Sequence, residues 1–305
     1  MTIMEQFRSF DSIQQARLGR RRFLSQAGLL SLGAAATTLA FGGSQRAYAG
    51  QDSTAEQSQE TAQSTDTVKE IFTAALIAED LATTFYYNGL VGTVIQDVNL
   101  AGPGGSATSV TSQGNAGNVN YLQAALSEEI SHANLFRSLL GIGSASQDPV
   151  QTFYFPAGSF DSLKAFTGLL DALENAFIGA YLNAIQEFAA KSANRQGSNG
   201  GALNSDDAMY TAEQLDYFAK VAASIMGIEA EHRVLGRVIS NTNPANNLAY
   251  EQTDGLNAVY NGPHSAVAAL TPFLSSSTGP GFSLSTALAK QGSVSLPITG
   301  NPPAF

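Results

Sequence analysis

Apolar residues recur at helical spacing in four long segments of the chain. The first begins near Thr67, where residues 67–70 read TVKE, the pattern of a capping box. The other three segments cover about residues 118–140, 161–193 and 211–241. In each, apolar residues three and four positions apart form one face, which is typical of an amphipathic helix. The pattern therefore predicts an all-α protein in which four helices bury these faces against one another.

The segments between the expected helices differ in length and composition. Residues 91–118 are rich in Gly, Ser, Thr and Asn, and residues 194–205 are rich in Gly and Asn, so both are predicted to be loops. Residues 141–158 are long enough to cross the side of a bundle between helices two and three. Residues 242–305 form an irregular C-terminal extension, with a short helix expected at 283–290 and a role in packing or assembly. The prediction is a four-helix bundle with one long crossover.

Acidic residues and histidines interrupt the apolar faces at repeated positions. The first and third helices each carry one such glutamate, and the second and fourth each carry a glutamate followed three residues later by a histidine. The residues are Glu79, Glu129, His132, Glu174, Glu229 and His232. Because the order is the same in both halves, the chain is interpreted as a duplicated helix pair.

This residue set is suited to metal chemistry. Residues i and i+3 lie on one helix face, so each Glu-x-x-His pair can reach one metal ion or help to bridge two. Four carboxylates and two imidazoles suit iron or manganese. Four unpaired carboxylates in an apolar core would cost several kcal/mol each, roughly, and no Lys or Arg interrupts the central part of any inner face. The sequence thus predicts two metal ions, Fe or Mn, as cofactors.

Other polar residues near these faces have a simpler interpretation. Asp80, Glu128 and Glu231 each lie one residue off the inner face, about 100° around the helix, and are not expected to be ligands. His264 follows a proline in an irregular segment and is expected at the surface. Taken alone, Glu79 or Glu174 would more often be a surface charge, and only their position within the face and their repeated spacing favour a ligand.

Two tyrosines share a spacing with the single glutamates. Tyr86 lies seven residues after Glu79, and Tyr181 lies seven after Glu174. They are weak catalytic candidates for proton or electron transfer beside the metals. The favoured alternative is that they are core aromatic residues whose hydroxyls find a hydrogen-bond partner.

Composition narrows the functional classes. The chain has no cysteine, which excludes disulfides, thiolate ligands and iron–sulfur clusters. The net charge is −10, and residues 50–305 alone hold 9 basic and 23 acidic residues, a net charge of −14. Such a surface repels nucleic acid and anionic lipid, so no nucleic-acid partner is expected.

The first residues have the features of an export signal. Residues 19–25 read GRRRFLS, similar to the twin-arginine motif, and a weakly apolar stretch at 27–41 leads to AYA at 47–49. That stretch is shorter than the ~18 residues of a spanning helix, so no stable membrane insertion is expected once a signal at 1–49 is cleaved. Residues 50–66 are polar and are expected to be a disordered spacer. The expected location is the periplasm, the cell surface or outside the cell.

Three segments of the predicted helices have a specific sequence: ALIAE at 75–79, GAYL at 179–182 and, most specifically, ASIMGIEAEH at 223–232. Through them, residues 67–241 resemble the bacterial ferritin-like domain family that includes desiccation-related proteins. This resemblance implies a ferritin-like four-helix bundle and the metal ligands named above. Related proteins include oxidases, ferroxidases, rubrerythrins and manganese catalases, and this chain lacks the cysteine-rich module of rubrerythrins.

Two functions follow as hypotheses. The first is an exported redox metalloenzyme acting on peroxide or dioxygen, catalase-like or ferroxidase-like, in oxidative or desiccation stress. The second is a structural or stress-protective protein that keeps the bundle without turnover. Fold alone does not separate them, and self-association into a homo-oligomer is left open.

Overall fold

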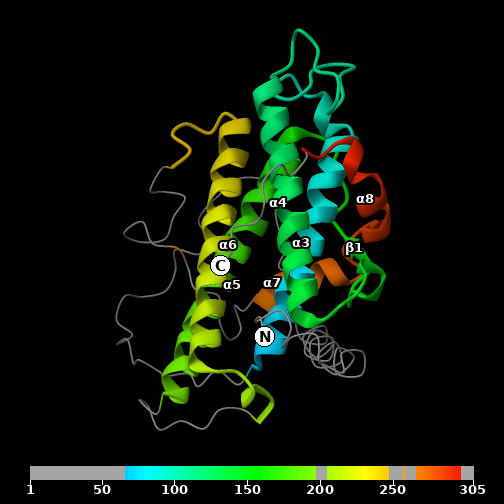
Figure 1. Cartoon of the computed structure of the whole chain (residues 1–305). Helices are drawn as coiled ribbons and strands as arrows, with labels where there is room; N and C mark the ends of the chain where they lie inside the picture. Colours follow the sequence, from blue (N-terminus) through cyan, green and yellow to red (C-terminus); the bar gives the residue numbers. More distant parts are fainter. Residues whose placement is uncertain (1–65, 197–204, 247–256, 258–265, 297–305) are drawn as a thin grey trace.

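A computed structural model describes residues 66–196, 205–246, 257 and 266–296. Its main elements are four long helices, drawn in Figure 1. They are α3 (Val68–Val91), α4 (Ala116–Leu140), α5 (Leu163–Arg195) and α6 (Ala212–Ile239). The predicted all-α bundle is confirmed, because α3 packs along α4 and α5 packs along α6, and the two pairs face each other.

Side-chain caps fix where the four helices begin. Thr67 and Thr211 each form a capping box with the residue three positions on, as the sequence predicted. Asn115 caps α4 and Ser162 caps α5 through their side chains, which moves these two starts to Ala116 and Leu163. The expected starts were therefore wrong by two residues each, because the apolar pattern marks the buried face and not the cap.

Two apolar clusters fill the bundle, one toward each end. The first cluster contains buried residues from 77–90, 119–130 and 163–177 together with Ile239. The second cluster contains buried residues from 68–76, 133–140, 181–188 and 215–225. The start of α3 thus lies beside the end of α4, the end of α5 and the start of α6. This arrangement requires the connection between α4 and α5 to run the length of the bundle.

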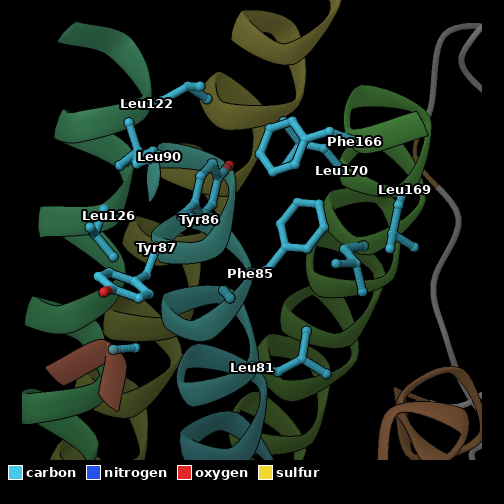
Figure 2. Close-up of a cluster of buried hydrophobic side chains, with 14 of the residues drawn as sticks. Leu81, Phe85, Tyr86, Tyr87, Leu90, Leu122, Leu126, Phe166, Leu169 and Leu170 are labelled. Carbon is cyan, nitrogen blue, oxygen red and sulfur yellow. The ribbon is translucent and has the colours of Figure 1, made fainter. Parts of the chain in front are cut away.

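Aromatic packing joins the two helix pairs within the first cluster. Figure 2 shows Phe85 of α3 facing Phe166 of α5, and their rings stack with centroids 4.5 Å apart and planes 2° apart. Gly89 allows this approach, because a Cβ there would lie 2.5 Å from the Phe166 ring. The pairs are therefore held closely at this end of the bundle.

The crossover and the C-terminal extension pack together on the outside of α3 (Figure 1). In the crossover, β1 (Thr152–Tyr154) pairs antiparallel with β2 (Gly281–Ser283) of the extension. The extension also contains α7 (Ala266–Leu270) and α8 (Leu284–Lys290), and α8 confirms the short helix expected at 283–290. Short 3₁₀ helices occur at Val94–Gln96, Ala145–Gln147, Ser205–Asp207, Thr271–Leu274 and Gln291–Ser293. Leu284 and Ala287 are buried in the first cluster, so the extension completes the core.

Several expectations fall on other parts of the chain. The signal at 1–49, nearly all of the spacer at 50–66, and His264 lie outside the described residues. No helix within the described ranges has the length and apolarity needed to span a bilayer.

Candidate metal centre

A layer of polar side chains separates the two apolar clusters. Each long helix contributes to it from the middle of its buried face, and the six contributors are Glu79 of α3, Glu129 and His132 of α4, Glu174 of α5, and Glu229 and His232 of α6. The four glutamates and His232 are at most 2% exposed. The structure thus brings together all six residues that the sequence singled out.

The six residues form two overlapping ligand groups. One contains Glu79, Glu129, His132 and Glu229, and the other contains Glu129, Glu174, Glu229 and His232. In each group, one donor atom per residue lies within 4.8 Å of the others. Glu129 and Glu229 belong to both groups, which is the arrangement expected of carboxylates that bridge two positions.

Both imidazoles present Nδ1 to the carboxylates. His132 Nδ1 lies 3.3 Å from Glu79 Oε2 and 3.5 Å from Glu229 Oε1. His232 Nδ1 lies 3.0 Å from Glu129 Oε1 and 3.4 Å from Glu229 Oε2. Each ring is therefore directed into the cluster through the same nitrogen.

The two tyrosines link the helix pairs through the outer carboxylates. Tyr86 of α3 donates a hydrogen bond to Glu174 Oε1 of α5 at 2.6 Å, and Tyr181 of α5 donates to Glu79 Oε1 of α3. Both rings are almost fully buried. The favoured interpretation, core aromatic residues with satisfied hydroxyls, fits this geometry, and the hydroxyls also touch two of the candidate ligands.

The buried oxygens of the centre test whether metal ions fit it. Both oxygens of Glu129, both oxygens of Glu229 and one oxygen of Glu174 are buried without a hydrogen bond, as is His232 Nδ1. Buried polar atoms are rarely left without a partner, because that costs about 1–3 kcal/mol each and more for a charged group. Carboxylate oxygens and imidazole nitrogen are ligands for iron and manganese. The cluster therefore fits metal binding by its donor set and by its buried oxygens that lack a hydrogen bond.

Burial and mutual charge shift the pKa values within the cluster. Burial raises the pKa of Glu79 and of Glu174 well above the usual carboxyl value, and the carboxylates beside them raise it further. Although burial lowers the pKa of His132 and His232, the glutamates around them outweigh it and raise both pKa values well above the usual imidazole value. Burial opposes ionisation of Glu129 too, but the two histidines hold its pKa below the usual range. The metal-free cluster thus retains protons that metal ions would displace.

The three acids that the sequence placed outside the inner helix faces, Asp80, Glu128 and Glu231, lie in three different environments. Glu231 is exposed, and Asp80 is buried outside the centre. Glu128 is 45% exposed but its Oε2 lies 2.8 Å from His232 Nε2, on the side of the ring opposite Nδ1. Glu128 belongs to neither ligand group, as expected, but it contacts one of the candidate ligands, which the pattern along one helix does not reveal.

A separate buried ion cluster lies beside the centre. Arg137 Nη2 of α4 lies 2.5 Å from Asp80 Oδ1 of α3 and 2.7 Å from Asp148 Oδ2 of the crossover. Arg137 also donates to Asn134 Oδ1 at 2.9 Å. The sequence did not reveal this cluster, because Asp148 lies in a segment with no periodic pattern.

These features define a four-helix bundle with a buried carboxylate–histidine centre suited to metal ions. The sequence model of the ferritin-like domain family matches residues 67–197, which include α3, α4 and α5 and four of the six residues of the centre. Residues 67–197 therefore form a ferritin-like domain. The comparisons with curated proteins and with solved structures gave no match.

Proposed function

We propose that the ferritin-like domain holds two iron or manganese ions and carries out redox chemistry on peroxide or dioxygen. The observation that supports this most is the set of buried carboxylate oxygens without hydrogen bonds around two imidazoles. An inert core would have replaced such oxygens with apolar groups at little cost, whereas metal ions stabilise them.

The residues divide between two metal positions. Glu79 and His132 would hold one ion, Glu174 and His232 would hold the other, and Glu129 and Glu229 would serve both. Two metal ions bound in this way would change oxidation state during the reaction, and their positive charge would attract the oxygen atoms of peroxide or dioxygen.

The chain's own groups control protons and access at the centre. The hydroxyls of Tyr86 and Tyr181 stay protonated and donate hydrogen bonds to carboxylates of the centre. They stay protonated because burial and the neighbouring glutamates raise the pKa of both hydroxyls well above the usual value. His132 is 13% exposed and Glu128 lies at the surface, so water and small polar molecules approach from the side of α4 and α6. A small polar substrate that enters on this side would not have to cross either apolar cluster.

The test combines metal content with turnover. The mature chain is loaded with Fe(II) or Mn(II), metal per chain is measured by mass spectrometry, and consumption of peroxide and of dioxygen is followed. We expect about two ions per chain and turnover that Glu229→Gln reduces at least a hundredfold. Glu231→Gln, an exposed glutamate two positions along α6, is the matched control and should change neither quantity. A folded chain that takes up no metal would refute the proposal.

The alternative is a metal that only stabilises the bundle in a protective protein. The burial of the centre between two apolar clusters favours this function as well, because structural metal ions contribute folding free energy. If two bound ions raise the melting temperature but neither peroxide nor dioxygen is consumed, the structural alternative is supported.

We also propose that the chain is exported by the twin-arginine route and acts in oxidative or desiccation stress at the periplasm or cell surface. Support comes from the GRRRFLS motif and the resemblance described above. Changing Arg20 and Arg21 together to Lys should retain the precursor in the cytoplasm, which fractionation would detect. Unchanged export of that variant would refute the route.

A further inference from the structure

A cavity of about 110 Å³ lies between α3 and α5, and residues from the start of α6 and from α7 complete its lining. Val267 and Leu270 are the residues that α7 contributes to its wall. The cavity is distinct from the carboxylate–histidine centre, since none of the six residues of that centre lines it.

The cavity exists because small residues face large ones. Ala75 and Ala78 of α3 and Ala184 of α5 lie on its wall, opposite rings that include Phe136 and Phe218. Each alanine leaves the volume of a longer side chain unfilled, whereas the rings resist collapse. The sequence favours this, because alanine is a strong helix former that keeps the helices regular while leaving space between them.

The walls show which molecules fit. Most of the lining is aliphatic or aromatic, so a water molecule inside would lack the two to four polar partners that ordered water requires. An apolar cavity of ~150 Å³ is large enough to bind benzene or xenon. The volume here is of the same order, and it is far too small for a peptide or a second protein.

The negative charges in the lining restrict the class of ligand further. Asp66 and Glu187 contribute to the lining, and Glu187 accepts a hydrogen bond from Asn183, which also lies there. Carboxylates at the opening repel anions, so a fatty acid or another carboxylate is disfavoured relative to a neutral molecule. The composition of the wall and opening therefore points to a compact, uncharged, apolar ligand.

One residue connects the cavity to the centre. The side chain of Tyr181 lines the cavity, and its hydroxyl donates to Glu79 of the centre. Ala78, which immediately precedes Glu79, also lies on the wall. A molecule in the cavity would thus be separated from the candidate metal ligands by a single buried side chain.

We propose that this cavity is a binding site for a small, neutral, apolar organic molecule of about six to eight non-hydrogen atoms, lying against Tyr181 beside the centre. The site does not require bound metal. It also differs in chemistry from the polar approach past Glu128, so the centre has an aqueous side and an apolar side.

Benzene is the probe for the test, added to the full-length mature chain in metal-free and metal-loaded forms. Binding is followed by aromatic and methyl NMR shifts and by thermal unfolding. We expect one saturable site with a dissociation constant on the order of 0.1–1 mM. Ala184→Leu should fill the cavity and weaken binding at least tenfold. Ala189→Leu, an exposed alanine on the same helix, should leave binding unchanged and serves as the matched control.

The outcomes separate this proposal from the proposed function. Saturable benzene binding that Ala184→Leu abolishes supports the cavity site, even in a chain that takes up no metal. Absence of saturable binding, or equal binding by the Ala184→Leu and Ala189→Leu variants, refutes it, whatever the metal content. If Ala184→Leu does not fold, Ala75→Leu fills the same cavity from α3 and replaces it in the comparison.

Discussion

Glu79 and Asp80 are neighbours on α3, but they belong to two different buried acidic clusters, and the positive partners in the two clusters differ. Asp80 meets Arg137, whose guanidinium also reaches Asp148, so that cluster contains its own cation. Glu79 turns to the centre, where it meets His132 and other carboxylates. In the ion pairs described for the six residues of the centre, the only basic partners are its two histidines.

This difference separates a structural ion cluster from a site for a ligand. A buried carboxylate beside a fixed guanidinium has its partner whenever the chain folds, without an ion taken from solution. The centre holds four carboxylates and two imidazoles, so it is stabilised only by protons or by cations taken from solution. The same burial thus produces a permanent contact in one place and dependence on the environment in the other.

The largest effect is expected at the cluster that contains Arg137. Arg137→Met leaves Asp80 and Asp148 buried without their cation and should lower the free energy of unfolding by about 3–5 kcal/mol. Chemical denaturation measures this, with Lys220→Met on the exposed surface of α6 as the control. Metal uptake by the folded fraction should be unchanged, and its loss would show that the two clusters are not independent.

Metal addition should be the next largest effect. Binding to the folded state alone adds about 3–4 kcal/mol at a free metal concentration of 100 to 1,000 times the dissociation constant. For a domain of this size, that corresponds to an increase on the order of 10 °C in the melting temperature. Calorimetry with and without Mn(II) or Fe(II) measures it. An increase equally large in Glu229→Gln would place the stabilising ion elsewhere.

Removing one carboxylate from the centre should lower stability with and without metal. Glu229→Gln takes away a buried carboxylate whose oxygens lie 3.5 Å from His132 Nδ1 and 3.4 Å from His232 Nδ1. Because the glutamates raise the pKa of both histidines, the metal-free variant leaves these buried imidazoles with one partner fewer and should be less stable than the parent by about 1–3 kcal/mol. The increase on metal addition should disappear. Unfolding curves in the presence of a chelator measure the first effect. A more stable metal-free variant would mean that repulsion among the carboxylates outweighs these contacts.

The pH dependence of the metal-free protein follows from the raised pKa values. Glu79, Glu174, His132 and His232 bind their protons more tightly in the folded state. Their contribution is complete below the unfolded values, near 4.5 for Glu and 6.5 for His, and is lost as the pH rises through the raised folded values. The free energy of unfolding of the metal-free protein should therefore fall between pH 5 and 8. The fall is about 1.4 kcal/mol per pH unit for each group that keeps its proton in the folded state and has lost it in the unfolded state. Melting temperatures that rise over this range would contradict the assignment.

The smallest effect is expected at the hydrogen bonds between helix pairs. Tyr86→Phe removes the donor to Glu174 while keeping the ring, and should cost about 1 kcal/mol. Tyr121→Phe, at an exposed position on α4, is the matched control. Since the lost bond orients one carboxylate, metal affinity should fall by about tenfold. Unchanged affinity would limit Tyr86 to packing.

Much of the bundle could be predicted because its signals are local. Capping boxes at Thr67 and Thr211, the apolar periodicity and the glutamates within it all lie within one helix each. The grouping of the six polar residues also followed, because each interrupts an apolar face that must point inward. The repeated order in the two halves supplied the rest.

What the sequence did not reveal depends on contacts between segments far apart. The contact of Glu128 with His232 joins two helices, and the contact of Asp148 with Arg137 joins a loop to a helix. The cavity beside Tyr181 results from the spacing of α3 and α5, which no pattern within one helix specifies. Such features depend on tertiary packing, for which sequence periodicity carries no information.

The crossed tyrosine bonds have a consequence for the symmetry of the chain. Tyr86 of the first helix pair contacts Glu174 of the second, and Tyr181 of the second contacts Glu79 of the first. Reciprocal contacts of this kind are characteristic of an isologous interface between two identical subunits. The domain is thus arranged as a two-fold dimer of helical hairpins joined in one polypeptide, in which neither hairpin alone contains a complete centre.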